Sequence, residues 1–309
     1  MSAWPGVLAG LGAAAGWATA SHMFARALDR DEGGLSASSA NLFKNTTALV
    51  VLGAVGLGIG AVYPGDARVG WLLVSGLMGF ALGDSLYFAA FSRCGVQVAA
   101  IIGNLVPPLA ALLAFFVLDE ALSPTALIGM GISLGGIALV VLDSGPGTRA
   151  IDPKQLRIGV GFACLNSLLQ AGAILTGRMG LEGADLLPGT VLRLVGGVGG
   201  AVVLAGLAAV ARGPRGVVRE VSGLVRPLGR RHVIRVLWLA TFIGAIVNLP
   251  LHSLAMGTLS PGVSAILFAT TPLWTLPIGL RFGERYGWRT ALGTAAGFGG
   301  VALVILASA

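Results

Sequence analysis

An internal repeat inside apolar sequence restricts the fold of this chain more than any other feature. Residues 95–142 and residues 259–306 align without a gap when one is shifted by 164 positions. The two copies share a proline, a glutamate and a double glycine at matched places. The matched residues are Pro108 and Pro272, Glu120 and Glu284, and Gly135-Gly136 and Gly299-Gly300. A repeated apolar unit of this length predicts a membrane fold built from two related halves.

The composition excludes an ordinary soluble domain. Hydrophobic residues make up 55% of the chain and charged residues only 11%, whereas soluble domains carry about 25% charged residues. A membrane-spanning helix needs about 20 mostly apolar residues. We therefore predict an all-α integral membrane protein with ten transmembrane helices. Their expected ranges are 4–28, 36–62, 69–92, 96–118, 124–142, 155–179, 187–211, 233–257, 261–281 and 287–307.

The ten predicted helices divide into two groups of five. The first half covers residues 1–142 and the second half covers residues 155–309, with a loop at 143–154 that is rich in turn-forming residues. Because five is odd, the second half must enter the membrane from the opposite side. The sequence therefore predicts a 5+5 inverted repeat with a pseudo-two-fold axis in the membrane plane.

The basic residues are distributed unevenly over the predicted connections. Only Arg68 and Arg178 fall in or beside even-numbered connections. Lys44 and Arg193 lie deep within predicted helices, and all other Lys and Arg residues are in or beside odd-numbered connections. The positive-inside rule then predicts a multi-pass protein of the cell (inner) membrane, with its odd connections cytoplasmic and both termini outside. The net charge of +7 belongs to these membrane-flanking loops, so no nucleic-acid partner is expected.

Three ionisable side chains fall deep inside predicted helices, where charge is costly. Lys44 lies in the second helix, Arg193 at the matched place in the seventh, and Asp84 in the third. We hypothesise that the two cations face a cavity and bind substrate there. Two alternatives stay open: each cation snorkels toward an interface, or Lys44 and Asp84 form a structural ion pair. Asp84 could instead bind a substrate amine or carry a coupling proton.

Other polar and aromatic residues within apolar helices are candidates for the same site. Some lie beside helix prolines, whose freed carbonyls need a partner or a wet cavity. The set is Tyr87, Asn104, Asn166, Gln170, Asn248, His22, His252, Trp17 and Trp274. Hydrogen bonding between helices is the alternative for the polar members. Their spacing fits no metal site, and no cofactor is expected. Glu120 and Glu284 are expected at helix ends, as caps or interfacial ion pairs outside the site.

The run from Pro108 through Glu120 and Gly129 to Gly135-Gly136, with its copy in the second half, resembles the drug/metabolite transporter superfamily. The chain is similar to ten-helix members with two EamA-type repeats. This resemblance implies a central cavity lined by helices 1–4 and 6–9, with helices 5 and 10 outside at the contact of a homodimer. Many relatives keep both termini in the cytoplasm, and the charge distribution here predicts the reverse.

The expected function is secondary transport by alternating access, with a small-molecule substrate and membrane lipids as partners. The deep charges of Lys44, Arg193 and Asp84 sum to +1, which favours a small anionic or zwitterionic metabolite such as an amino acid or organic acid. Export is the expected direction. The alternative is an exporter of cationic or amphipathic drugs. A polytopic membrane enzyme is a remote alternative, because no convergent nucleophile, base or metal cluster is visible. No GxxxxGK[ST] loop for ATP is present.

Overall fold

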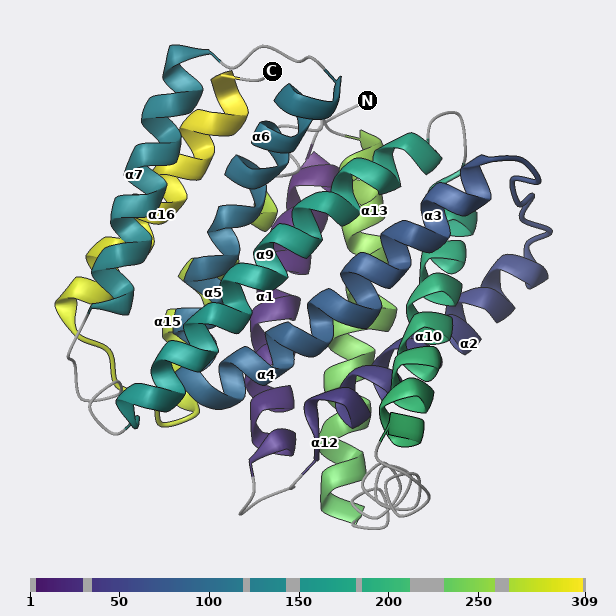
Figure 1. The fold of residues 1–309 in the computed structure, drawn as a ribbon, viewed down its shortest axis with the longest axis horizontal. Coiled ribbons are helices and arrows are strands. Elements are labelled where there is room, and N and C mark those ends of the chain that lie inside the picture. Colours follow the sequence, from purple (N-terminus) through teal and green to yellow (C-terminus); the bar gives the residue numbers. More distant parts are fainter. Residues whose placement is uncertain are drawn as a thin grey trace.

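The computed structural model describes residues 4–29, 35–118, 123–142, 151–181, 185–211, 231–258 and 267–307. Within these ranges the backbone forms helices joined by short connections, and they contain no strand (Figure 1). The predicted all-α class is therefore confirmed for the described part of the chain.

Local capping signals set several helix bounds in the first half. Its helical segments are α1 (Trp4–Leu28), α2 (Ala37–Gly58), α3 (Arg68–Gly76), η1 (Leu77–Gly83), α4 (Asp84–Cys94), α5 (Val96–Ile102), η2 (Gly103–Leu105), α6 (Val106–Leu118) and α7 (Pro124–Val141). The Ser36 hydroxyl accepts the backbone N–H of Ser39 at 3.1 Å and so starts α2. Ser123 caps α7 in the same way, and Pro124 follows in the first turn. Gly95 has φ 84° and turns the chain between α4 and α5.

The described residues after position 150 form a second series of helices. Its segments are α9 (Pro153–Leu181), α10 (Leu186–Ala211), α12 (Arg231–Thr241), η4 (Phe242–Val247), α13 (Asn248–Thr258), α15 (Thr271–Arg281) and α16 (Trp288–Ala307). The chain passes without interruption through α3, η1 and α4, and again through α12, η4 and α13. Each of these runs is thus one long helix with a π-helical middle.

Several of these helices are long and apolar enough to cross a membrane. Within the described residues there are six, with a shorter apolar helix at Pro124–Val140. The six are Ala37–Gly58, Arg68–Cys94, Val96–Val117, Pro153–Leu181, Leu186–Leu207 and Arg231–His252. The chain is a multi-pass membrane protein.

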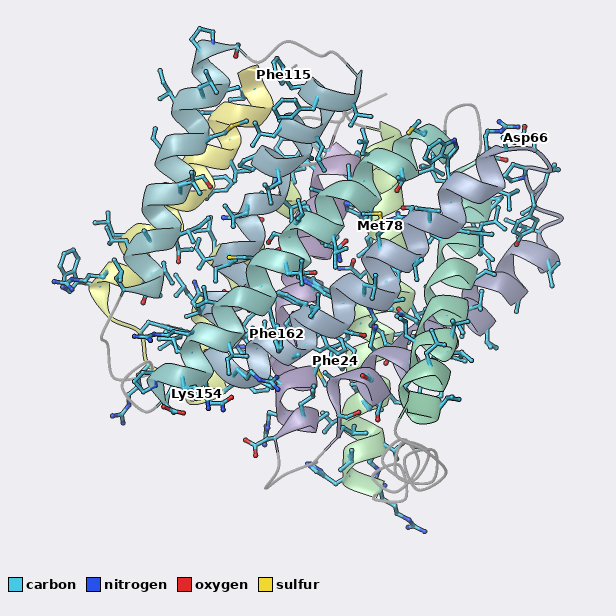
Figure 2. All side chains as sticks on the ribbon, viewed as in Figure 1. Phe24, Asp66, Met78, Phe115, Lys154 and Phe162 are labelled. Atoms are coloured by element: carbon cyan, nitrogen blue, oxygen red, sulfur yellow. The ribbon has the colours of Figure 1, made fainter. Side chains whose placement is uncertain are left out.

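The ends of the chain lie on one side of the bundle. α1 begins and α16 ends at the same end of the helices, and the connection between α15 and α16 lies at the opposite end (Figure 1). Figure 2 shows Asp66 near the first end and Lys154 near the other. Asp66 accepts two hydrogen bonds of 2.9 Å from the Arg68 side chain, which lower the pKa of this exposed carboxyl. One of the two basic residues predicted on the even side therefore has its charge balanced locally.

The two π-helical segments occupy matched places in the repeat. η1 ends immediately before Asp84, and η4 ends immediately before Asn248, which is the residue 164 positions later. A π-turn inserts an extra residue and leaves backbone carbonyls without their usual helical partner. Asp84 and Asn248 thus sit on the same distortion in each half, with a carboxylate in one and an amide in the other.

The closing helices of the two halves, α7 and α16, pack against each other along their length (Figure 1). The second glycine of each repeated pair makes this approach. A Cβ at Gly136 would overlap the Gly297 backbone, and a Cβ at Gly300 would overlap the Ser133 backbone. A Cβ at Gly135 or Gly299 would meet open space. In each repeated double glycine, only the second residue is therefore required for the close packing.

The main buried core lies between α1, α4, α5 and α12. Phe24 of α1 and Phe88 of α4 are fully buried, with ring centroids 4.7 Å apart, and Phe24 points into the bundle in Figure 2. Ile101 of α5 and Leu237 of α12 complete the same cluster. This core holds α1 and α4 together beside the polar residues described next.

Candidate functional site

Lys44 and Asp84 form an ion pair between α2 and α4. Their side chains are only 5% and 7% exposed, and the Lys44 ammonium contacts Asp84 Oδ2 directly. The ammonium also lies 5.5 Å from the ring centroids of Trp17 and Phe88 and 6.0 Å from that of Phe80. Aromatic faces attract a cation most when water is excluded. Lys44 is thus held by a carboxylate and an aromatic enclosure, as the ion-pair alternative described.

Two asparagines on α2 bind the π-helical segment before Asp84. Asn41 Nδ2 donates to the Phe80 carbonyl at 2.7 Å and to Ser85 Oγ at 2.9 Å. Asn45 Nδ2 donates to the same Phe80 carbonyl at 2.9 Å. These bonds satisfy a carbonyl of the π-turn, and they fix the register of α2 against α4. Neither asparagine was among the residues predicted from the sequence, although Asn41 lies one turn before Lys44 and Asn45 directly follows it.

α9 supplies two amides from the second half to this cluster. Gln170 Nε2 donates to Asp84 Oδ1 at 3.0 Å. Asn166 lies one turn earlier and is buried, and its Oδ1 has no hydrogen-bond partner among the described residues. Both amides approach Gly83, where a Cβ would lie 3.2 Å from either side chain. The carboxylate of the first half is therefore contacted by the second half, and an amide oxygen without a hydrogen-bond donor lies near it.

Arg193 reaches the same cluster from α10. Its Nε donates to Ser75 Oγ at 2.9 Å, and Ser75 Oγ donates to the Ala173 carbonyl at 2.6 Å. The guanidinium carbon lies 4.9 Å from the Phe80 ring centroid. In the described part of the chain, no carboxylate lies within ion-pair distance of Arg193. The side chain of Phe80 thus lies within cation–π distance of both cations, and among the described residues only Lys44 is in direct contact with a carboxylate.

Tyr87 and Trp17 belong to the same cluster, and Asn248 has a different role. Trp17 and Tyr87 stack with centroids 6.2 Å apart. Asn248 Nδ2 donates to the Ala13 carbonyl of α1 at 2.5 Å. Asn248 therefore joins two helices, as the hydrogen-bonding alternative described, whereas its counterpart Asp84 carries charge.

The remaining candidates have other neighbours. His252 packs on the Phe268 ring at 4.7 Å and lies within electrostatic range of Arg193. Asn104 is buried with an unpartnered Nδ2, near Gly297 of α16. Trp274 is 37% exposed and donates to Thr270 Oγ1 at 3.2 Å. No direct contact joins Asn104 or Trp274 to the Lys44–Asp84 pair among the described residues.

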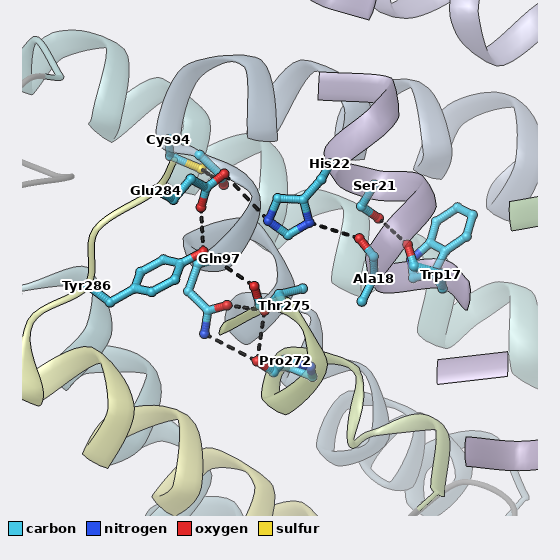
Figure 3. A network of polar contacts seen from close by, with 11 residues as sticks. Trp17, Ala18, Ser21, His22, Cys94, Gln97, Pro272, Thr275, Glu284 and Tyr286 are labelled. Carbon is cyan, nitrogen blue, oxygen red and sulfur yellow. Dashed lines mark hydrogen bonds and ion pairs between the residues drawn. The ribbon is translucent and has the colours of Figure 1, made fainter. Parts of the chain in front are cut away.

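His22 lies in a second polar network, at the end of α15 (Figure 3). Its Nε2 is 3.5 Å from Glu284 Oε1, which is ion-pair distance but too long for a good hydrogen bond. Tyr286 donates to Glu284 Oε2 at 2.5 Å. Partial burial raises the pKa of Glu284, but the contacts from His22 and Tyr286 lower it by more, so its pKa lies below the usual 4.5. Glu284 was expected in an interfacial ion pair, and its partner is His22. Glu120 lies outside the described residues.

Comparison with known proteins identifies the fold and shows a similarity to one transporter family over part of the chain. The chain has the same fold as a solved structure whose description reads only "Crystal structure of protein". The TM-score between the two is 0.64. It is 19% identical in sequence, and the alignment covers 97% of this chain and 96% of the other. No protein with a curated function matches the chain. Residues 4–142 match the model of the EamA-like transporter family, and this match ends where the first predicted half ends. Through these residues the chain is similar to the EamA-like transporter family, which is part of the drug/metabolite transporter superfamily.

Proposed function

We propose that this protein is a secondary transporter that exports a small anionic or zwitterionic metabolite, such as an amino acid or an organic acid, by alternating access. The proposed site is the cluster around Phe80, with Arg193 as its anion-binding residue. The proposed framework is an inverted repeat of five plus five transmembrane helices. The family match supports transport, and the charges of the cluster support the substrate class.

The single observation that carries this proposal is the arrangement of Arg193. Its Nε is already bonded to Ser75, and one face of the guanidinium lies on Phe80. The two terminal nitrogens keep the fork that binds a carboxylate or phosphate with two parallel hydrogen bonds. A guanidinium held in this way loses little further freedom when an anion binds. A partly buried cation without a carboxylate beside it is also stabilised when an anion binds.

The residues around Asp84 support a zwitterionic substrate. Lys44 and Asp84 cancel in charge, so Arg193 leaves the net charge at +1. The Asp84 carboxylate and the unpartnered Asn166 Oδ1 are acceptors that suit a substrate amine. An amino acid could thus bind with its carboxylate at Arg193 and its ammonium toward Asp84. An organic acid would use Arg193 alone.

Matched structural features support movement of two related halves. The π-turns before Asp84 and Asn248, and the paired glycines of α7 and α16, recur at the repeat spacing. Opposite rocking of two such halves would expose a central site to each side in turn. We further propose that the odd-numbered connections are cytoplasmic and that the outer faces of α7 and α16 form a homodimer contact. A C-terminal reporter active only in the cytoplasm would contradict the orientation.

The test begins with ligand-dependent melting of the purified protein. Amino acids, organic acids, polyamines and cationic drugs are compared on the wild type and on the Arg193→Gln, Arg193→Lys and Arg235→Gln variants. Arg235 is exposed on α12 and loses the same charge away from the cluster. An anionic or zwitterionic ligand should stabilise the wild type and Arg235→Gln. Its affinity for Arg193→Gln should fall at least about 30-fold, the equivalent of about 2 kcal/mol.

Counterflow in proteoliposomes then separates transport from binding. The stabilising ligand should exchange across the membrane with the wild type and not with Arg193→Gln. Stabilisation by cationic drugs alone would favour the drug-exporter alternative. Binding without counterflow would make the protein a receptor, and conversion of the ligand would make it an enzyme. Equal affinity of the wild type and Arg193→Gln would overturn the site.

A further inference from the structure

The His22–Glu284 contact belongs to a network that joins the first half to the second at the end of α15. We call this network the joint and define it as His22, Gln97, Thr275, Glu284 and Tyr286. Figure 3 shows these side chains converging from α1, α5, α15 and the connection that follows α15. Thr275 donates to Gln97 Oε1, and Gln97 Nε2 donates to Thr294 Oγ1 at 2.8 Å. Any movement that separates α1 and α5 from α15 must break this network.

The tautomer of His22 follows from its backbone contact. Nδ1 lies 2.9 Å from the Ala18 carbonyl oxygen. A carbonyl oxygen only accepts hydrogen bonds, so Nδ1 must carry the hydrogen. If the ring is neutral, Nε2 then presents a lone pair. This nitrogen is buried, has no hydrogen-bond partner among the described residues, and faces Glu284 Oε1 at 3.5 Å.

A lone pair against a carboxylate is an unfavourable contact in a dry environment. One proton removes the conflict in either of two places. On Nε2 it makes an imidazolium opposite a carboxylate, and on Glu284 it makes a carboxylic acid that can donate to the ring nitrogen. Tyr286 already donates to the other carboxylate oxygen, at 2.5 Å. The contact is therefore complete only when His22 and Glu284 together hold one ionisable proton.

We propose that His22 and Glu284 form a proton-binding site that holds the joint closed, and that loss of the proton opens the joint. The site is separate from the Arg193 cluster and needs no substrate. Proton release breaks the attraction between α1 and the connection after α15. The hydrogen bonds that join Gln97 to Thr275, to the Pro272 carbonyl and to Thr294 then remain as polar contacts between α5 and the second half. The joint thereby makes access from this end of the bundle depend on pH.

Among the described ionisable groups around the joint, the His22–Glu284 pair is the one that can accept a proton. On α1, Arg26 lies one turn beyond His22, with its guanidinium 5.8 Å from the Phe282 ring centroid. His22 also stacks on Phe282, at 5.4 Å. Arg281 and Arg285 flank Glu284 in sequence and are exposed. α5 and α15 contribute the neutral side chains of Gln97 and Thr275, α4 contributes the Cys94 thiol drawn in Figure 3, and burial raises the pKa of Tyr286.

The test measures opening of the joint as a function of pH, without substrate. Spin labels are placed at Ser38→Cys and Arg281→Cys, two exposed positions in opposite halves, with Cys94 and Cys164 replaced by alanine. The label-to-label distance is measured between about pH 5.5 and about pH 9, a range that spans histidine titration. The wild type should show one short distance at low pH and a growing longer population as the pH rises.

Two substitutions of Glu284 should have opposite effects on the label-to-label distance. In Glu284→Gln the amide can donate to Nε2 without a proton, so the short distance should persist at every pH. In Glu284→Ala the longer population should be present at every pH. His232→Gln, which alters an exposed histidine at the start of α12, should titrate like the wild type. A wild-type distance that does not change with pH, or a Glu284→Gln variant that titrates like the wild type, overturns the proposal.

A second measurement needs no spin labels, so it tests the proposal even if the labelled variants do not fold. The chain has three histidines, so ¹⁵N-histidine spectra of the unlabelled full chain can be assigned with His232→Gln and His252→Gln. His22 should carry a hydrogen on Nδ1 at every pH. A neutral His22 with its hydrogen on Nε2 overturns the proposal. Failure of the Arg193 site would leave both results unchanged, so this proposal and the transport proposal fail independently.

Discussion

Lys44 on α2 and Asp84 on α4 neutralise each other inside the first half, while Arg193, the predicted counterpart of Lys44, has no carboxylate within ion-pair distance among the described residues. The two cations therefore lie at similar places in the sequence, but they differ in whether a carboxylate pairs with them. Lys44 is a structural partner in this conformation, and Arg193 is available to an anion.

The Lys44–Asp84 pair predicts unequal effects of single and double substitutions. Lys44→Gln or Asp84→Asn alone leaves a buried charge without its partner, which costs about 3–5 kcal/mol. The double variant Lys44→Gln/Asp84→Asn removes both charges and should recover most of that loss. Melting temperatures of the four purified proteins in detergent measure this difference. Additive losses would show that the pair is not coupled.

Ser75 should act on ligand binding through Arg193. Ser75→Ala removes the oxygen that accepts from Arg193 Nε and leaves the guanidinium free to turn. A hydrogen bond to a charged group contributes about 1.5 kcal/mol or more, so affinity for an anionic ligand should fall about tenfold. Thr176→Ala is a matched control, because within the described structure that hydroxyl donates only to carbonyls of α9 itself. Titration calorimetry with the ligand found by melting measures both. Equal losses from the two variants would contradict the role of Ser75.

Adjacent glycines should respond oppositely to the same substitution. Gly136→Ala places a methyl group against the Gly297 backbone and should destabilise the α7–α16 contact by about 1–3 kcal/mol. Gly135→Ala meets open space and should be neutral or stabilise the helix by about 0.5–1 kcal/mol. Gly300→Ala and Gly299→Ala should repeat this contrast in α16. Thermal melting of the four variants provides the test, and equal effects within a pair would contradict the packing.

Acid should weaken the contribution of Glu284 to stability. Its pKa in the folded protein is below the usual value of 4.5 because the contacts from His22 and Tyr286 outweigh burial. A lowered folded pKa means that the stabilisation is present above the unfolded pKa and is lost as the pH falls through the folded pKa. The difference in melting temperature between the wild type and Glu284→Gln should therefore shrink below about pH 4.5. A difference that grows on acidification would contradict the lowered pKa.

Much of the fold could be predicted from the sequence because each apolar helix is recognisable from its own segment. The helix at Trp4–Leu28 has the predicted bounds, and most other ends lie within a few residues of prediction. The second predicted helix extended to residue 62, but α2 ends at Gly58 because Gly60, with φ 67°, forms a turn there. The π-turns before Asp84 and Asn248 could not be predicted, because they depend on partners from other helices such as Asn41.

The candidate site was only partly visible in the sequence. Lys44, Asp84 and Arg193 could be predicted as site candidates because they lie deep within apolar helices, where charge is rare and costly. The sequence did not indicate which charges meet, since ion pairing depends on how α2, α4 and α10 are rotated about their axes. His22 illustrates the same difficulty: its partner Glu284 is 262 residues away in the chain.

The sequence by itself determined that the chain is a helical membrane protein, where its helices run, and which charges they must shelter. These properties depend on composition and spacing along one segment at a time. Only the tertiary structure decided that Asp84 neutralises Lys44 and leaves Arg193 without a carboxylate partner in the described structure, and that His22 faces Glu284 across the joint. Those relationships arise from contacts between helices, where a small rotation of one helix determines whether two polar atoms meet.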